Sequence, residues 1–226
     1  MRVPKKKNLD ARMLACAPVL IRDPSALRGR WREAFGCGRL KAELGCGFGR
    51  FALTVARREP ETFLLGVEKV PSVLVAAAEQ ALAAGQPNLR FVAAQAEELA
   101  AWFAPGELDT VYLNFSDPWP KERHAKRRLT SAAHLALYAQ VLVPQGSLEF
   151  KTDNAALFSW SLEQLGEAGW RIAEYTEDLH KDGLAGAVTD YELKFHARGL
   201  PIRFVRALPP LPASGPEGSP AAETDA

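Results

Sequence analysis

The chain has 226 residues and a mass of 24.7 kDa, which predicts one α/β domain with short appendages. Hydrophobic residues make up 47% of it and charged residues 24%, a composition that excludes wholesale disorder. No apolar run approaches the ~18 residues that a membrane span needs, and the start MRVPKKKNLD lacks the apolar stretch of a signal peptide. We therefore expect a cytoplasmic protein with no membrane partner.

The cysteines and histidines argue against metal and disulfide chemistry. The three cysteines, Cys16, Cys37 and Cys46, are an odd number and form no CxxC pair. The four histidines form no HExxH motif. The sequence therefore predicts no metal site and no disulfide framework.

The net charge of +1 conceals two basic segments on an acidic remainder. Residues 1–32 carry a net charge of +7 and residues 121–128 carry +4, which leaves −10 for the rest of the chain. Clustered Lys and Arg favour a polyanion partner, because they displace the counterions that condense on phosphates. Charge alone leaves a second interpretation open, in which the two segments are a solubilising tail and a solvated helix face.

From residue 39 onward, short apolar runs alternate with helical patterns. Runs at 39–45, 62–68, 88–93, 108–115 and 147–153 predict strands, and the intervening 51–58, 71–84, 97–103 and 131–142, with 155–169 after them, predict helices. This βαβ alternation predicts a Rossmann-like, mostly parallel sheet with helices on both faces. Residues 170–179 and 189–205 predict two late strands at an antiparallel edge, with Tyr191, Leu193 and Phe195 alternating along the second.

The two ends of the chain differ from the segment between them. Residues 1–35 predict a basic extension whose first thirty residues are unanchored, and which could fold onto RNA only when RNA binds. Residues 36–208 form the predicted α/β domain. Residues 209–226 are rich in Pro, Ala and acidic side chains, which predicts a disordered tail.

The first predicted strand ends in a glycine-rich loop. Gly45, Gly47 and Gly49 allow a tight turn and a close backbone approach to a ligand. A dinucleotide fingerprint, GxGxxG, needs its third glycine at position 50, where this chain has Arg50, so the spacing is GxGxG and disfavours NAD. Glu43, two residues before the first glycine, argues against a diphosphate. A Gly-rich connector with no ligand is the alternative.

Acidic and amide side chains end the next two strands. Glu68 ends the second strand, where a carboxylate can accept two hydrogen bonds from ribose hydroxyls. Gln95 ends the third and could contact an adenine edge, although Glu97 and Glu98 also fit the first turn of a helix. Glu43, the glycines and Glu68 together predict a pocket for an adenosine that carries positive charge, which describes S-adenosylmethionine.

The fourth strand leads into the loop Ser116-Asp117-Pro118-Trp119-Pro120. Two prolines stiffen this loop, so Asp117 would be held rigidly near the ligand. Guanine N7 already has a lone pair, so its methylation needs no base, whereas a fixed carboxylate would orient the purine and offset its developing positive charge. A rigid surface turn without function is the alternative.

The motifs ELGCGFGRF, GVEK, YLNFSDPWPKERHAKRRLT, KTDN and TDYELKF resemble the bacterial tRNA (guanine-N7-)-methyltransferase family over roughly residues 40–205. DPWPK followed by RHxKRR is the specific part of this resemblance. It implies a class I S-adenosylmethionine-dependent fold and methyl transfer to N7 of the variable-loop guanine, position 46 of tRNA.

The resemblance also implies roles for individual residues. Cofactor contacts fall on Glu43, Gly45, Gly47, Gly49, Glu68, Gln95 and Asp117, with Asp117 also catalytic. Gln95 departs from the family pattern, which usually has Asp or Asn there. Substrate contacts fall on Lys121, Asp153, Thr189, Tyr191 and Glu192. RNA contacts fall on Arg123, His124, Lys126, Arg127 and Arg128.

Two other functions remain open from the sequence. One is an amino methyltransferase that acts on another nucleic-acid or protein nitrogen, because Asp117-Pro118-Trp119 loosely resembles the DPPY loop of that class. The other is a non-catalytic RNA-binding protein on the same scaffold. We expect a monomer or a weak homodimer, with tRNA as the partner.

Overall fold

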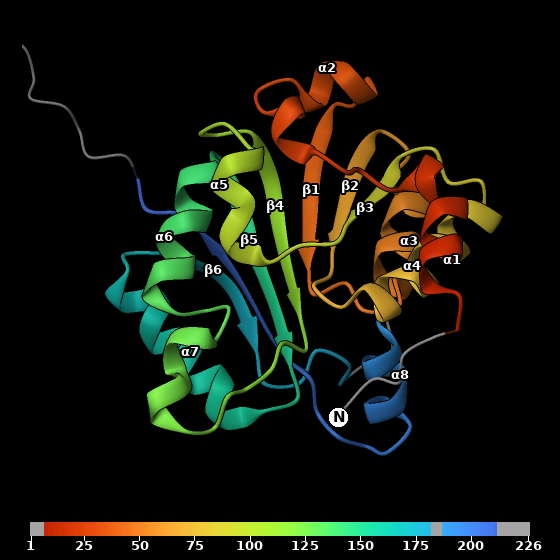
Figure 1. Cartoon of the computed structure of the whole chain (residues 1–226). Helices are drawn as coiled ribbons and strands as arrows, with labels where there is room; N and C mark the ends of the chain where they lie inside the picture. The colour runs from red at the N-terminus through yellow and green to blue at the C-terminus, as the bar shows by residue number, and fades with distance from the viewer. Residues whose placement is uncertain (1–6, 182–186, 212–226) are drawn as a thin grey trace, which may run out of the picture.

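The computed structural model describes residues 7–181 and 187–211, which form a seven-stranded sheet in the order β3-β2-β1-β4-β5-β7-β6 (Figure 1). Strands β1 to β5 run parallel, and β7 runs antiparallel to both β5 and β6. The fold class predicted from the sequence is therefore confirmed. The strands are β1 (Arg39–Leu44), β2 (Thr62–Val67), β3 (Leu89–Val92), β4 (Leu108–Asn114), β5 (Leu142–Thr152), β6 (Arg171–Thr176) and β7 (Arg203–Leu208).

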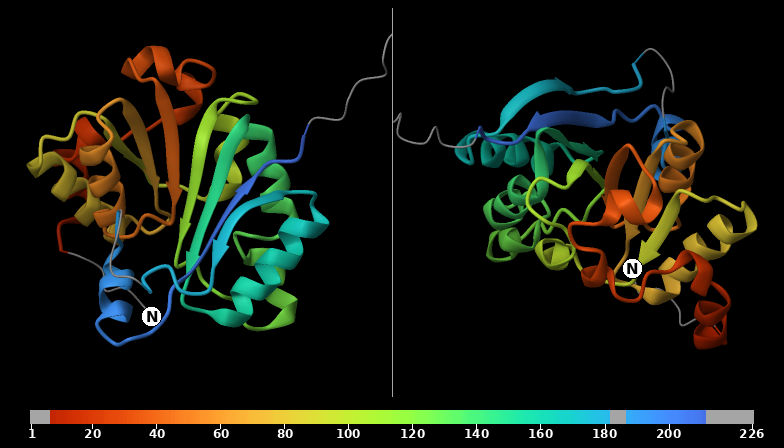
Figure 2. Two further views of the ribbon diagram at one scale, coloured as in Figure 1. Left: turned by 180° about the vertical axis from the view of Figure 1, so that it is seen from behind. Right: turned by 90° about the horizontal axis from the view of Figure 1, so that it is seen from above.

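Helices cover both faces of the sheet (Figure 2), and an apolar cluster packs each face. Because side chains alternate along a strand, Leu40, Ala42 and Leu44 of β1 face one cluster, while Lys41 and Glu43 point to the opposite face. The first cluster packs under α5 (Leu99–Trp102), α6 (Ala132–Val141) and α7 (Ala155–Glu167). The second packs under α3 (Arg50–Arg58) and α4 (Pro71–Ala83). Glu43 therefore lies on the α3 side of the sheet.

The first thirty residues do not match their prediction. The described part of this segment forms α1 (Leu9–Ala15), η1 (Ala17–Val19) and η2 (Pro24–Leu27), and it packs on the sheet, with Cys16 and Val19 only 1% and 5% exposed. The helix α2 (Trp31–Phe35) follows it and packs there too. Trp31 is fully buried, and its Nε1 donates to Trp102 O at 2.9 Å. The prediction of an unanchored start was wrong because apolar residues were spaced too irregularly to signal packing. The domain boundaries remain predictions, and residues 1–6 and 212–226 lie outside the described chain.

The prediction of a second late strand over residues 189–205 is also partly wrong. Residues 189–205 contain the helix α8 (Asp190–His196), and only β7 is a strand. Thr189 and Glu192 form a capping box, in which Glu192 N donates to Thr189 Oγ1 at 3.0 Å and Thr189 N donates to Glu192 Oε2 at 2.7 Å. Tyr191 and Phe195, four residues apart, stack with a centroid separation of 6.3 Å. The capping box and the Tyr191–Phe195 contact therefore favour a helix here, although the alternation of apolar side chains indicated a strand.

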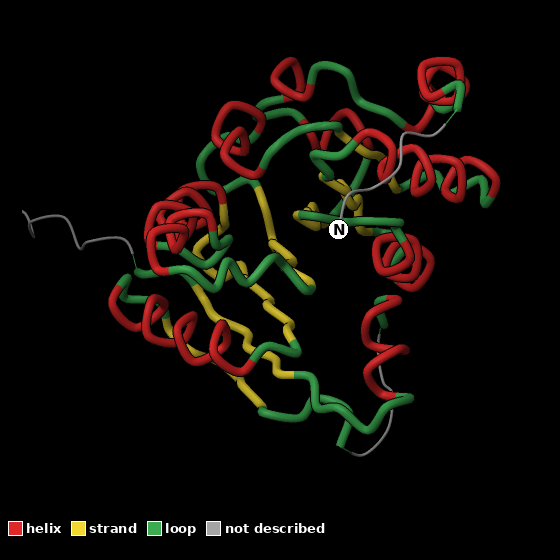
Figure 3. The backbone as a smooth tube through the Cα atoms, turned by 60° about the horizontal axis from the view of Figure 1, so that its bottom comes forward, coloured by secondary structure: helices red, strands yellow, loops and turns green. Residues whose placement is uncertain are grey.

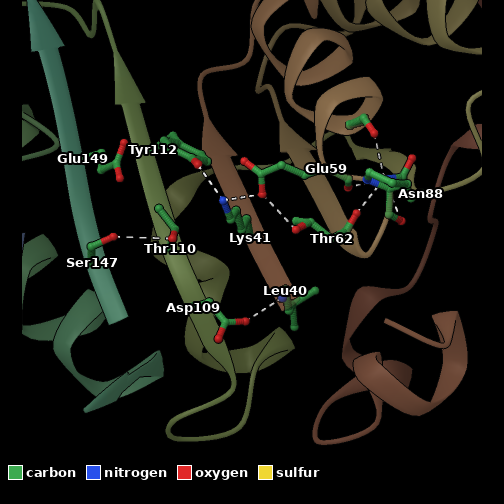
Figure 4. Close-up of polar contacts among 12 residues, drawn as sticks. Leu40, Lys41, Glu59, Thr62, Asn88, Asp109, Thr110, Tyr112, Ser147 and Glu149 are labelled. Atoms are coloured by element: carbon green, nitrogen blue, oxygen red, sulfur yellow. Dashed lines mark hydrogen bonds and ion pairs between the residues drawn. The ribbon is translucent and has the colours of Figure 1, made fainter. Parts of the chain in front are cut away.

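A polar network on the α3 side of the sheet satisfies a buried lysine (Figure 4). Lys41 is 7% exposed, and its Nζ donates to Glu59 Oε2 at 2.7 Å and to Tyr112 Oη at 3.0 Å. Burial opposes ionisation of Glu59, but the hydrogen bonds and charge of Lys41, with Thr62, outweigh it and lower the pKa of Glu59. The polar groups of this network find their hydrogen-bond partners within it, so we assign the network a structural role.

Gly49 is required by close packing at the start of α3. Its φ is +78°, and a Cβ there would lie 2.7 Å from Ala77 Cβ and 3.4 Å from the Phe91 ring. We expect Gly49→Ala to lower the free energy of unfolding by ~1–3 kcal/mol, because it adds both strain and overpacking. Chemical denaturation of the two proteins measures this, and unchanged stability would contradict the packing argument.

Candidate active site

Most of the predicted site residues lie at or after the carboxyl ends of the parallel strands. Figure 3 brings this end of the sheet forward. Glu43, at the end of β1, is 2% exposed, and its Oε1 accepts from Asn114 Nδ2 of β4 at 2.9 Å. Its Oε2 is buried and has no hydrogen-bond partner in the described chain. Burial raises the pKa of Glu43 to about 8, although the hydrogen bond from Asn114 and the charge of Lys151 oppose the shift. Such an unpaired buried oxygen can accept a ligand donor.

The glycine loop and Glu68 lie against each other. Glu68 Oε2 accepts from Gly47 N at 3.3 Å and its Oε1 accepts from Val70 N at 2.9 Å, so the carboxylate is held beside the loop. Gly45 and Gly47 have φ of +75° and +56°, and a Cβ on either would meet nothing within 4 Å. These two glycines thus leave open space, whereas Gly49 is packed.

The buried thiol of Cys46 lies near both Glu43 and Glu68. Burial, followed by the charges of Glu43 and Glu68, raises the pKa of Cys46 well above its ordinary value. Both carboxylates therefore act on the same thiol, so Glu43 and Glu68 lie around one loop. A thiol kept protonated in this way is unsuited to nucleophilic attack.

Gln95 and Asp117 are both exposed, and the Asp117 carboxylate forms no ion pair with a described residue. Gln95 precedes η3 (Ala96–Glu98), and its backbone N donates to Glu98 Oε1 at 3.1 Å. Asp117 follows β4 by three residues, in a loop where Phe115 and Trp119 have φ of +53° and +41°. Positive φ at two bulky residues marks a strained loop, which is frequent at functional sites.

The segment from Thr189 to Glu192 forms the start of α8, beyond the carboxyl ends of the strands (Figure 1). Thr189 is 7% exposed, and Tyr191 is 55% exposed. Glu192 is fully buried, and its Oε1 accepts from Lys151 Nζ and from His180 Nε2, both at 2.9 Å. In this arrangement, only Tyr191 of the three predicted substrate contacts presents a large surface to solvent.

Contacts from three strand ends hold α8 in place. Arg50, just after the glycine loop, forms an ion pair with Asp190. The Phe115 ring, just after β4, stacks on Tyr191 at 5.4 Å and on Phe195 at 6.1 Å. Lys151 of β5 forms the buried ion pair with Glu192 described above. The helix therefore covers the region between the glycine loop and the loop that carries Asp117.

The predicted RNA contacts lie on η4 (Glu122–Arg127) and at its end. Lys121, Arg123, Lys126 and Arg127 are exposed, and the Arg127 guanidinium lies 5.0 Å from the centre of the Trp119 ring. The His124 ring packs edge-on against the same indole at 5.8 Å. Asp153, also exposed, precedes Asn154, whose Oδ1 caps α7 by accepting from Leu157 N at 2.8 Å.

Four residues of this region were absent from the sequence prediction: Asn114, Phe115, Lys151 and His180. Asn114 and Lys151 lie on the same sheet face as Glu43 because they follow Tyr112 and Glu149 by two residues. The quoted motifs contained Phe115 and Lys151, but neither residue had a chemical signal of its own. His180 reaches Glu192 only through tertiary packing.

Comparisons with known proteins identify the family. A family model described as "Putative methyltransferase" matches residues 38–205. A tRNA (guanine-N(7)-)-methyltransferase of Geobacillus thermodenitrificans is 42% identical over 212 residues, which cover 93% of this chain and 98% of the relative. The chain belongs to the tRNA (guanine-N7-)-methyltransferase family. A Listeria welshimeri relative of the same name is 42% identical over 92% of this chain and 98% of its own length.

Solved structures agree on the fold. The 16S rRNA methyltransferase KamB superposes with a TM-score of 0.62 at 19% identity, over 80% of this chain and 93% of that one. A 16S rRNA (adenine(1408)-N(1))-methyltransferase mutant from Catenulisporales acidiphilia, solved with its cosubstrate SAM, has a TM-score of 0.58 at 21% identity, over 84% and 92%. The family and the class I fold expected from the sequence are thus both confirmed.

The described residues contain neither a membrane-spanning helix nor a metal-binding cluster. Across residues 7–181 and 187–211, no helix has the length and apolar composition to cross a membrane. The same ranges contain no cluster of three His, Cys, Asp or Glu side chains that could hold a metal ion.

Proposed function

We propose that this protein transfers a methyl group from S-adenosylmethionine to N7 of the variable-loop guanine, position 46, of tRNA. The observation that carries the proposal is 42% identity over 93% of the chain to proteins named for this reaction. Glu43 lies near the carboxyl end of β1 and the Asp117 loop follows the neighbouring parallel strand β4, so both lie at the same edge of the sheet.

The cofactor fits the residues around the glycine loop. Glu43 offers a buried oxygen without a partner, and Gly45 and Gly47 leave open space beside it. Glu68 is held at the same loop, where its carboxylate can accept from ribose hydroxyls, and Gln95 follows the next strand. When bound, S-adenosylmethionine supplies an electrophilic methyl group on a sulfonium ion.

Asp117 acts on the acceptor base. Guanine N7 attacks with its own lone pair, and the purine becomes positively charged as the bond forms. A carboxylate fixed near the ring stabilises that charge and orients the base, which lowers the barrier without any proton transfer. We assign Lys121, Asp153 and the Thr189–Glu192 segment to the substrate nucleotide, as the family pattern implies.

An exposed aromatic surface supports a base-binding role for α8. Tyr191 stacks on Phe115 with an interplanar angle of 16°, and Phe115 lies two residues before Asp117. Stacking on an aromatic ring contributes ~1–3 kcal/mol per base in single-stranded recognition. A guanine that leaves the tRNA stack can therefore rest on this surface beside Asp117.

The exposed cations of η4 suit tRNA phosphates. Arg123 and Lys126 make no side-chain hydrogen bond or ion pair with any described residue. We expect the double variant Arg123→Ala, Lys126→Ala to weaken tRNA binding and to reduce the slope of log K against log salt by about one per removed charge. Filter binding at several salt concentrations measures this. An unchanged slope would remove these side chains from the RNA interface.

The proposed function is tested by incubating the protein with S-adenosylmethionine and an unmodified tRNA transcript, followed by nuclease digestion and mass spectrometry. We expect 7-methylguanosine at position 46, and none in a transcript with adenine there. Methylation of another nitrogen would favour the amino methyltransferase alternative. No methylation, together with no calorimetric binding of S-adenosylhomocysteine, would favour a non-catalytic RNA-binding protein. A cytoplasmic location and a monomeric or weakly dimeric state stay predictions.

A further inference from the structure

The last arginine of the basic segment makes contacts that differ from those of its neighbours. Arg128 Nε donates to Pro118 O at 3.0 Å, and its Nη2 donates to Trp119 O at 3.1 Å. The guanidinium also lies 4.3 Å from the centre of the Trp160 ring on α7. Arg128 is only partly exposed. Its donors are thus used within the protein, on the backbone carbonyls of Pro118 and Trp119, the two residues that follow Asp117.

The loop that receives these hydrogen bonds has little other support. In the described chain, no backbone–backbone hydrogen bond joins residues 116–120 to another segment. Trp119 has a φ of +41°, a conformation that a bulky residue keeps only when its surroundings hold it. The prolines at 118 and 120 have no N–H to donate. The two hydrogen bonds from the Arg128 guanidinium are therefore the main polar restraint on this loop.

We propose that Arg128 is a positioning residue: it fixes the peptide groups after Asp117, and through them the direction of the Asp117 carboxylate, instead of binding tRNA phosphate. This inference rests on the proposed function, because it acts through the role of Asp117 there. It separates Arg128 from Arg123, Lys126 and Arg127, which are exposed and remain available to RNA.

The chemistry of the contact requires arginine. A guanidinium is planar and rigid, so it can donate to two successive carbonyls while its face stacks on an indole. A lysine ammonium keeps the charge but has neither the planar fork nor the flat face. Arg128→Lys therefore removes the positioning and leaves the charge, whereas Arg128→Ala removes both.

The experiment measures three quantities for each variant: the single-turnover methylation rate at saturating tRNA and cofactor, the tRNA dissociation constant as a function of salt, and the dissociation constant of S-adenosylhomocysteine. For Arg128→Ala and Arg128→Lys we expect the rate to fall about 100-fold, because misplacing a reacting group by ~1 Å has that effect. We expect the tRNA and S-adenosylhomocysteine constants to stay within about 2-fold, and the salt slope to be unchanged.

Two other arginine variants serve as controls for the Arg128 measurements. Arg123→Ala should weaken tRNA binding and lower the salt slope by about one. Arg171→Ala, on the edge strand β6, should match the wild type in all three measurements. If Arg128→Ala instead lowers the salt slope as Arg123→Ala does and keeps the full rate, Arg128 is a phosphate contact and the inference is wrong. Retention of the full rate by Arg128→Lys would also overturn it.

A double-variant cycle tests the coupling to Asp117. If Arg128 acts through Asp117, adding Arg128→Ala to Asp117→Asn should slow methylation by less than about 3-fold further. A further loss of about 100-fold would mean that the two residues act independently, which contradicts the inference. A wild-type protein that does not methylate tRNA would contradict the proposed function, whereas a wild-type protein that methylates tRNA, with an Arg128→Ala variant that keeps the full rate, would contradict this inference alone.

Discussion

Replacement of Asp117 by Asn is expected to lower turnover by ~100- to 1,000-fold, which is the loss typical of removing one group that stabilises transition-state charge. The substitution keeps the volume of the side chain and removes its negative charge. Because the carboxylate matters most when the purine becomes positive, binding of the ground-state tRNA should change by only a few fold. Single-turnover kinetics with saturating tRNA, combined with equilibrium binding, separate the two effects.

The control for this variant is Asp153→Asn, a second exposed aspartate at a strand end, which the family pattern assigns to substrate binding. We expect that change to act mainly on the Michaelis constant for tRNA. Activity of Asp117→Asn within a few fold of the wild type would remove the electrostatic role of Asp117. A parallel loss of tRNA affinity would indicate a binding role instead.

Glu43 is expected to link cofactor binding to pH. Its pKa is about 8 in the free protein because the side chain is buried, so at pH 7 it is mostly protonated. A cationic donor on the ligand favours the ionised carboxylate, so binding should release a proton near pH 7 and should tighten as the pH rises toward 8. Calorimetry of S-adenosylhomocysteine in buffers with different ionisation enthalpies measures the proton release.

Glu43→Gln should abolish both effects and weaken S-adenosylhomocysteine binding by ~10- to 100-fold, since a charge-assisted hydrogen bond contributes ~1.5–3 kcal/mol. Glu61→Gln, on an exposed acid before β2, is the matched control and should bind as the wild type does. Equal proton release by the wild type and by Glu43→Gln would show that another group titrates.

The same pKa predicts how stability depends on pH. The ordinary pKa of a glutamate is 4.5, whereas the pKa of Glu43 in the folded protein is about 8, so between these pH values the folded state holds a proton that the unfolded state has lost. Stability from this group is therefore full below about pH 4.5 and declines as the pH rises to about 8. Glu43→Gln should reduce that decline, which denaturation at several pH values would detect.

Local patterns were enough to predict the parallel sheet and the places of Glu43, Glu68 and Asp117. Each of these residues follows a short apolar run, and parallel strands bring their carboxyl ends to one edge whatever the helices do. The same local patterns gave the wrong structure for residues 189–196. There the alternation of Tyr191, Leu193 and Phe195 indicated a strand, whereas the capping box at Thr189 begins a helix.

The sequence by itself determined the fold class, because strand and loop signals depend on neighbouring residues, and its motifs determined the family. Only the tertiary structure decided that Trp31 is buried, that Glu192 pairs with Lys151 and His180, and that Arg128 holds the loop of Asp117. Most of these contacts join residues far apart in the chain, and the sequence does not distinguish Arg128 from the arginines beside it. The energy of each contact depends on burial and on distances between side chains, and both are set only when the chain folds.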